Sequence, residues 1–165
     1  ENDARILRWY GLDRTKGQSF RCTQNIKRAG FKYQMNDIAA VIGIENLAYA
    51  KDSVKCHRRN SKFLIENIHN NKVLVPEWNE DGSYWIFSMH VNKRRKDEFI
   101  KYMDDNSISV SPVHYRNDEY DCTRKYFEEN LPGVDSFSKT QVCIPNGWWL
   151  SQNDLNHIVS TINNF

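Results

Sequence analysis

A glycine-led loop that turns directly into an apolar helix is the feature that most constrains this chain. Residues 30–45 read GFKYQMNDIAAVIGIE, and the helical apolar pattern begins immediately after Asn36-Asp37. In a locally extended loop, the side chains at positions i and i+2 point the same way. We therefore expect three polar side chains to share one face of the loop: Lys32, Gln34 and Asn36. The three residues that alternate with them are expected to anchor the opposite face: Phe31, Tyr33 and Met35.

The start of a helix behind such a loop is a natural place for an anion. The first backbone N–H groups of a helix have no partner within the helix, and the helix dipole favours negative charge there. Polar side chains in the preceding loop would add further donors, so the combination suits a ligand that carries a phosphate. The same pattern also describes a simple helix entry without a ligand, and both interpretations stay open on this segment alone.

The composition is that of an ordinary globular domain with a moderate core, since 39% of the 165 residues are hydrophobic and 27% are charged. A net charge of +2 gives no electrostatic case for nucleic acid. No apolar run approaches the roughly 20 residues of a membrane helix. The four cysteines form no CxxC pair, so we expect no metal site. A reduced, cytoplasmic chain that contacts neither nucleic acid nor membrane is therefore predicted.

Hydrophobic periodicity predicts an α+β unit after residue 70, with helices on one face of a small sheet. Helices are expected at 4–11, 37–49, 51–69, 94–105, 122–130 and 134–141, and strands at 73–75, 83–92, 107–113 and 142–144. The helices at 37–49 and 51–69 would alternatively form one long helix. The first of them is expected to bury four apolar residues: Ile38, Val41, Ile42 and Leu47. Alternation in the second strand places Trp85 and Phe87 in the core.

The last helix carries the clearest local signals. Ser151 is the expected N-cap and Asp154 its partner in a capping box, which satisfies backbone N–H groups reciprocally. Leu150 and Leu155 occupy the two positions of a hydrophobic staple. An apolar stripe at helical spacing then follows: Leu155, Ile158, Val159 and Ile162.

Three polar residues follow the strand predicted at 107–113: His114, Tyr115 and Arg116. Side chains at a strand end often contact ligands, and this set could bind a phosphate or a sugar hydroxyl. The alternative is a loop whose polar groups hydrogen-bond to one another. No Ser/His/Asp, Cys/His or paired-carboxylate arrangement can be assembled from spacing, so we assign no catalytic residue.

The segments RILRWYGLDR and GFKYQMNDIAAVIGIENL resemble the DegT/DnrJ/EryC1/StrS family of sugar aminotransferases, which are PLP-dependent enzymes of fold type I. Further segments resemble the family in the same order: Arg58-Arg59 in a long helix, Trp85-Ile86-Phe87, Asp97-Glu98-Phe99, Ile108 through His114, and the closing IPNGWWLSQNDLNHIV. The resemblance runs over essentially the whole chain.

The resemblance implies an α/β fold that corresponds to the C-terminal part of such an enzyme. Residues 1–50 would be a remnant of the large PLP-binding domain, and residues 51–165 the small C-terminal α+β domain. In the family, the PLP-bonding lysine and the aspartate that pairs with the pyridine nitrogen would precede Glu1. Lys139 follows a similar Ser-Phe pair but stands in the wrong order. We therefore expect a chain taken from something longer, which alone lacks the catalytic lysine.

The resemblance also implies partners and ligands. Family members are homodimers in which this loop of one subunit reaches the PLP phosphate of the other, which makes Lys32, Gln34 and Asn36 the cofactor-binding candidates. Lys32 stands where many members carry Asn. The segment His114-Tyr115-Arg116 corresponds to the region that meets the nucleotide sugar. The implied function is amino transfer from glutamate to a nucleotide-linked keto-deoxysugar. The alternative is a non-catalytic module that binds a sugar nucleotide or a protein.

Overall fold

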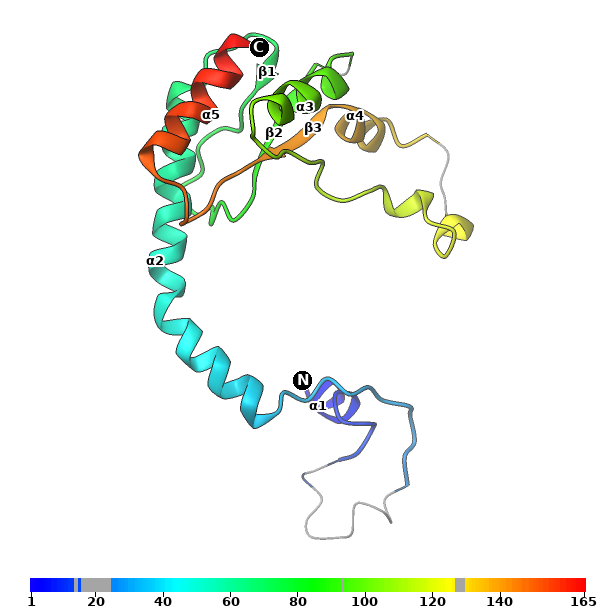
Figure 1. The fold of residues 1–165 in the computed structure, drawn as a ribbon. Helices are drawn as coiled ribbons and strands as arrows, with labels where there is room; N and C mark the ends of the chain where they lie inside the picture. Colours follow the sequence, from blue (N-terminus) through cyan, green and yellow to red (C-terminus); the bar gives the residue numbers. More distant parts are fainter. Residues whose placement is uncertain (14, 16–24, 93, 127–129) are drawn as a thin grey trace. The chain divides into compact units, whose positions relative to one another are not determined.

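The chain is described by a computed structural model that covers residues 1–13, 15, 25–92, 94–126 and 130–165 (Figure 1). It divides into two compact units, Glu1–Tyr49 and Ala50–Phe165. The long helix α2, Asp37–Asn67, contributes residues to both units. The assignment of these units to a large and a small domain stays a prediction.

The first unit begins with helix α1, Asn2–Leu7, which is shorter than the predicted helix at 4–11. The chain leaves the helix because Tyr10 and Gly11 adopt left-handed backbone conformations, with φ of 56° and 79°. This turn lets the Tyr10 N–H donate to the Phe31 carbonyl at 3.0 Å instead of continuing the helix. The turn therefore brings the segment behind α1 to the loop that begins at Gly30.

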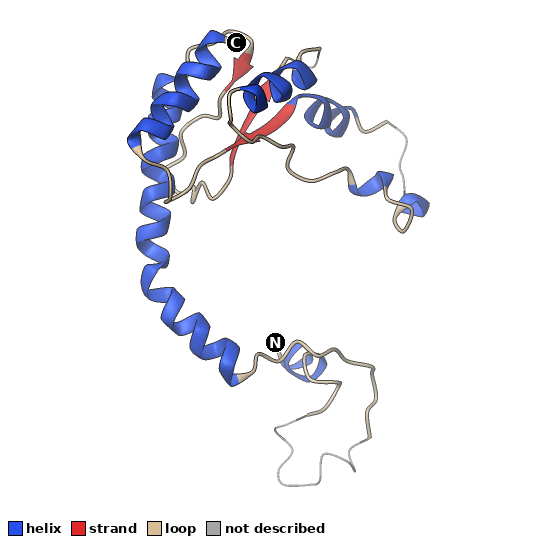
Figure 2. Ribbon diagram, viewed as in Figure 1, coloured by secondary structure: helices blue, strands red, loops and turns tan. Residues whose placement is uncertain are grey.

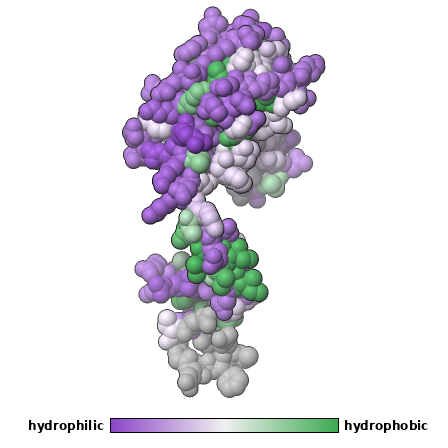
Figure 3. All heavy atoms as spheres, turned by 60° about the vertical axis from the view of Figure 1, so that its left-hand side comes forward, coloured by the Kyte–Doolittle hydropathy of each residue, from purple (hydrophilic) through white to green (hydrophobic). Residues whose placement is uncertain are grey.

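Helix α2 is continuous over 31 residues, so the interpretation as one long helix is confirmed. The expected burial of its first apolar residues is wrong, since their exposed fractions are as follows: Ile38 76%, Val41 59%, Ile42 56% and Leu47 71%. Figure 3 shows apolar side chains gathered on the surface of this N-terminal part. Periodicity reveals that a helix has an apolar face but not what covers it. No helix within the described residues has the length and apolar character needed to cross a membrane.

The second unit is built on an antiparallel sheet in the order β1-β2-β3 (Figure 2). Its strands are β1 (Val73–Leu74), β2 (Phe87–Val91) and β3 (Gln141–Ile144). Phe87 pairs with Ile144 and Met89 with Val142, so these apolar side chains share one face. Ser88 and Cys143 pair on the opposite face, as do His90 and Gln141. The sheet therefore has one apolar face and one more polar face.

Helices cover the apolar face to form a single core. They are the end of α2, then α3 (Lys96–Asp105) and α5 (Gln152–Asn164), and their buried residues are Leu64, Phe99, Met103, Leu155, Ile158 and Ile162. Helix α4, Pro132–Thr140, instead contacts the other face, where Phe137 packs edge-on against His90 with ring centroids 5.4 Å apart. The prediction that all helices lie on one face is therefore corrected.

Two of the predicted strands differ in the structure. Strand β2 begins only at Phe87, and Trp85 is 69% exposed, so its placement in the core is wrong. The predicted strand at 107–113 is reduced to one bridge, in which Ser111 and Cys143 exchange both backbone hydrogen bonds. Pro112 follows directly and has no N–H to extend the ladder.

The segment predicted as a helix at 122–130 contains a short 3-10 helix at Arg124–Tyr126, preceded by another at Asn117–Glu119. The rest of that prediction, residues 127–129, lies outside the described residues. Apart from these short helices, the backbone from Ser111, which bridges to β3, to Tyr126 is largely irregular, and residues 112–117 of this segment line a cavity.

The capping box of α5 is confirmed. The Ser151 hydroxyl accepts a hydrogen bond from the Asp154 N–H at 3.2 Å, and the Asp154 carboxylate accepts one from the Ser151 N–H at 2.7 Å. Two N–H groups at the start of the helix are thereby satisfied. The hydrogen bonds from Ser151 also hold the pKa of Asp154 below its usual value.

Replacing Ser151 with alanine is expected to lower the free energy of unfolding of the second unit by about 1 kcal/mol, because the cap is lost. Hydrogen exchange of the α5 amides in the full-length protein measures this change. Ser160→Ala is the matched control, since Ser160 is exposed inside the same helix and caps nothing. Equal destabilisation by the two substitutions would contradict a role for the cap.

Candidate functional site

The loop that begins at Gly30 is fastened to the end of α1 by backbone hydrogen bonds. The Phe31 N–H donates to the Leu7 carbonyl at 2.6 Å. The N–H groups of Tyr33 and Gln34 both donate to the Arg8 carbonyl, at 2.8 and 3.0 Å. These contacts use carbonyls at the end of α1 that have no partner within the helix. The loop position is therefore set by the backbone of α1.

The side chains expected to anchor this loop are exposed instead. Phe31 is 55%, Tyr33 75% and Met35 65% exposed. The rings of Phe31 and Tyr33 stack on each other with centroids 5.3 Å apart. The expected anchoring is therefore wrong, because backbone hydrogen bonds hold the loop and leave these apolar side chains on the surface.

The three polar residues of the loop have different surroundings. The Lys32 ammonium lies 3.7 Å from the centroid of the Trp9 ring, a cation–π contact. Gln34 is half-buried and lines a cavity beside α1. The Asn36 side-chain oxygen accepts a hydrogen bond from the Ala39 N–H at 2.8 Å, which caps α2. Their role as phosphate ligands stays a prediction.

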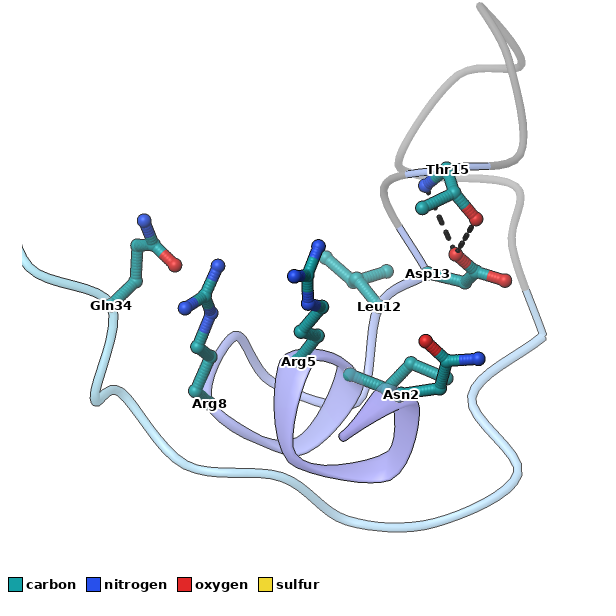
Figure 4. Close-up of a pocket in the computed structure, with 8 residues that line it drawn as sticks. Asn2, Arg5, Arg8, Leu12, Asp13, Thr15 and Gln34 are labelled. Atoms are coloured by element: carbon teal, nitrogen blue, oxygen red, sulfur yellow. Dashed lines mark hydrogen bonds between the residues drawn. The ribbon is translucent and has the colours of Figure 1, made fainter.

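The cavity beside α1 has a volume of about 550 Å³. Figure 4 shows Arg5, Arg8 and Gln34 projecting in the same direction from α1 and the loop. Arg5 also pairs with Glu1 at 2.6 Å. These two arginines were not among the site residues predicted from the sequence. Their spacing of three residues on a predicted helix, which places both on one side, was the available signal.

A second cavity lies on the polar face of the sheet in the second unit. We call it the α3–α4 cavity, and its volume is about 470 Å³. It is lined by the first residue of α3, the segment 112–117, one side of α4 and the start of β3: Lys96, Pro112, Val113, His114, Tyr115, Arg116, Asn117, Val134, Phe137, Ser138 and Gln141. The structure therefore brings all three predicted substrate-binding residues to one cavity.

The backbone at His114 is held in an uncommon conformation. Its φ is 56°, in the left-handed region that few residues other than glycine adopt. The preceding Val113 N–H donates to the Gln141 side-chain oxygen at 2.9 Å. Gln141 is 1% exposed and is itself oriented by hydrogen bonds from its amide to Ser88 and Cys143. A left-handed conformation at a residue other than glycine costs free energy, so it persists only where surrounding contacts enforce it, and such residues cluster at functional sites.

The Arg116 guanidinium is engaged by carboxylates of its own chain. It binds Asp118 through two hydrogen bonds, including Nε to Oδ1 at 3.0 Å, and it also binds Asp135 of α4. Glu119 lies 3.6 Å away. These hydrogen bonds hold the pKa of Asp118 below its usual value. Arg116 therefore fastens the segment 116–119 to α4, which leaves few of its donors for a ligand.

Tyr115 is 59% exposed at the same cavity. A hydrogen bond with Glu119 raises the pKa of the Tyr115 phenol above its ordinary value. The ring also packs against Tyr120 with centroids 5.3 Å apart. Tyr115 is therefore held by its own segment but keeps an exposed surface.

Replacing Arg116 with glutamine is expected to raise the titration midpoint of the Asp118 carboxyl. The pKa of Asp118 is lower in the folded protein than in the unfolded chain, where it is about 4. The Arg116–Asp118 ion pair therefore stabilises the folded segment above the unfolded pKa, and this stabilisation is lost as the pH falls through the folded pKa. The Arg116–Asp118 pair should therefore persist at neutral pH and weaken in acid. Carboxyl NMR measures the midpoint, with Arg124→Gln as the control. An Asp118 midpoint that Arg116→Gln leaves unchanged would show that the pair does not form.

No group of three or more His, Cys, Asp or Glu side chains among the described residues could hold a metal ion. Cys143 lies on the polar face of the sheet, where burial raises the pKa of its thiol. Cys56 and Cys122 are free, as is Cys143.

Comparison with known proteins identifies the family. The model of the DegT/DnrJ/EryC1/StrS aminotransferase family matches residues 1–163. The chain is 24% identical over 139 residues to GDP-perosamine synthase of Escherichia coli O157:H7, a match that covers 82% of this chain and 38% of that protein. The chain thus spans well under half of this relative's length.

Two solved structures are similar at higher identity. The sugar aminotransferase CalS13 from Micromonospora echinospora is 30% identical, with a TM-score of 0.84 over 97% of this chain and 43% of its own. AtS13 from Actinomadura melliaura is 31% identical, with a TM-score of 0.84 over 99% and 43%. These matches confirm the predicted fold, the C-terminal part of a fold type I aminotransferase. Because the family's sequence pattern extends along almost all of its residues, the chain belongs to the DegT/DnrJ/EryC1/StrS aminotransferase family.

Proposed function

We propose that this chain is the C-terminal portion of a nucleotide-sugar aminotransferase. The full-length protein would transfer an amino group from glutamate to a nucleotide-linked keto-deoxysugar with PLP as cofactor. The observation that carries this proposal is the family match over residues 1–163, which spans both units. The similarity to a GDP-sugar enzyme supports a nucleotide-linked acceptor.

The donor set of the 30–36 loop fits the phosphate of PLP. The loop offers one ammonium group and two amides, and it contains no carboxylate. Lys32 would supply a point charge, and the amides of Gln34 and Asn36 would donate hydrogen bonds. Asn36 can do this while its oxygen still caps α2. When bound, PLP supplies the electron sink that makes amino transfer possible.

The loop would reach this cofactor in a partner subunit, so we propose a homodimer. Support comes from the exposed apolar surface of the first unit, which includes the stacked rings of Phe31 and Tyr33 and the stripe along α2. Contiguous apolar surfaces of this kind commonly mark protein interfaces. A loop fixed by backbone hydrogen bonds leaves these side chains available for such an interface.

The substrate end of the site would use His114 and Tyr115. Both are exposed at the α3–α4 cavity and could donate hydrogen bonds to sugar hydroxyls. Gln141 would keep His114 in place through the Val113 N–H. Arg116 would act within the cavity wall through its carboxylate partners.

Transfer of nitrogen from labelled glutamate tests this proposal. We expect the full-length protein, supplied with PLP, nitrogen-15 glutamate and a set of nucleotide-linked keto sugars, to yield a nitrogen-15 amino sugar nucleotide detected by mass spectrometry. Nucleotide-sugar binding without transfer would instead support the non-catalytic module. Neither binding nor transfer with any nucleotide sugar in the set would contradict the proposed function.

A further inference from the structure

The α3–α4 cavity holds two cationic side chains whose surroundings differ. The Arg116 guanidinium is neutralised by carboxylates of Asp118 and Asp135. The Lys96 ammonium donates to the Ser138 carbonyl at 2.7 Å. Among the described residues, no carboxylate lies within ion-pair distance of Lys96. The described walls of the cavity therefore offer Lys96 a carbonyl partner but no carboxylate.

We propose that Lys96 binds the phosphate-bearing end of a nucleoside diphosphate group in the α3–α4 cavity. This inference rests on the proposed function, whose acceptor carries such a group. An ammonium is a compact charge with three hydrogen-bond donors. One of these is used by the Ser138 carbonyl, so two stay available for phosphate oxygens.

The position of Lys96 is unfavourable without an anion. It is the first residue of α3, where the positive end of the helix dipole disfavours a cation. Burial in the cavity wall also lowers the pKa of its ammonium group. The neighbouring Arg95 has a carboxylate partner in Glu98, at 2.6 Å, which Lys96 lacks. A bound phosphate would offset both the unfavourable helix dipole and the burial of the ammonium group. Residues placed in locally unfavourable surroundings are characteristic of functional positions.

The remaining walls of the cavity suit the uncharged part of a nucleotide. Val113, Val134 and Phe137 provide apolar surface, and Asn117 adds amide groups at the rim. A volume of about 470 Å³ lies within the range of small-molecule sites. An apolar wall next to the Lys96 ammonium favours a ligand with a flat base and a charged end over a bare anion.

Calorimetry on the full-length protein tests the assignment with GDP, UDP, dTDP and inorganic pyrophosphate as probes. Replacing Lys96 with glutamine is expected to weaken binding of the preferred nucleotide by about tenfold or more, since a charge-assisted contact is lost. Lys101→Gln is the matched control on the same helix, because Lys101 is paired with Asp105 at 2.8 Å. Lys96→Arg keeps the charge and should retain most of the affinity.

Several results would overturn the inference. Unchanged nucleotide affinity in Lys96→Gln would do so, as would equal affinity of the wild-type protein for pyrophosphate and nucleotide, which would indicate a free anion. Wild-type protein that binds none of the probes also contradicts it. If Lys96→Gln melts early, its nucleotide affinity is compared with that of the wild-type protein at a temperature at which both are folded, and equal affinities there overturn the inference.

The nitrogen-transfer experiment separates this inference from the proposed function. The wild-type protein could transfer nitrogen while Lys96→Gln shows an unchanged KM for the nucleotide sugar. That result would exclude the role of Lys96 and leave the proposed function intact. If no transfer occurs but nucleotide binding depends on Lys96, the proposed enzyme function is rejected and the nucleotide site is supported.

Discussion

Replacing Gly30 with alanine is expected to detach the 30–36 loop from α1 and to lower amino transfer in the full-length protein by about 100-fold. A Cβ atom at this position would collide with the Gly11 nitrogen, and it would lie 2.6 Å from the Tyr10 carbonyl carbon and 2.7 Å from the Leu7 carbonyl oxygen. These are backbone atoms, so no side-chain rotation can relieve the clash. The hydrogen bond that Leu7 accepts from Phe31 should break first.

Gly43→Ala provides a matched control for Gly30→Ala. A Cβ atom at Gly43 meets nothing within 4 Å, and alanine favours the helix in which Gly43 lies. Hydrogen exchange should show that Gly30→Ala exposes the N–H groups of Tyr33 and Gln34, whereas Gly43→Ala leaves them protected. Equal protection and equal activity in the two variants would mean that the tight approach at Gly30 does not position the loop.

The second large effect is expected at the core of the second unit. Phe99→Ala should lower the free energy of unfolding of residues 50–165 by about 3–5 kcal/mol, because a large cavity replaces the ring. Phe99 is fully buried and packs edge-on against Phe165 with ring centroids 5.1 Å apart. Hydrogen exchange of the most protected β2 and α3 amides in the full-length protein measures the change.

Leu74→Ala is the control for Phe99→Ala. Leu74 is an apolar residue of the same unit, but its side chain is 68% exposed on β1. Its removal should change the free energy of unfolding by less than about 0.5 kcal/mol. Similar losses for the two substitutions would contradict the placement of the core between the sheet and the helices α2, α3 and α5.

Local signals in the sequence predicted the parts of the fold that depend on neighbouring residues. The capping box at Ser151 and Asp154 forms as expected, because both partners lie within one turn. Alternation predicted the buried face of β2 from Phe87 onwards but extended it wrongly to Trp85, which precedes the strand. Periodicity correctly predicted a helix with apolar residues on α2, but their exposure depends on tertiary partners that periodicity does not reveal.

The parts of the candidate site that depend on neighbouring residues were also predicted from local signals in the sequence. The loop at 30–36 and the segment His114-Tyr115-Arg116 were found because each is a short run of unusual residue types. The pairing of Arg116 with Asp135 was not predictable, since the two residues are far apart in sequence and meet only through the position of α4. Lys96 was not singled out from the sequence, and only the fold places it in the same cavity wall as His114.

If the 30–36 loop binds the phosphate of PLP, its side chains contribute to the affinity of the full-length protein for PLP. Three variants each alter one candidate ligand: Lys32→Gln removes the positive charge, and Gln34→Ala and Asn36→Asp each remove an amide donor. The last keeps an oxygen to cap α2. Lys27→Gln, outside the loop, is the control.

We predict that loop variants weaken PLP binding by about 10- to 100-fold, as expected for the loss of a charge-assisted hydrogen bond. Lys27→Gln should bind PLP as the wild-type protein does. PLP affinity that none of the three loop variants changes would show that the loop does not hold the PLP phosphate.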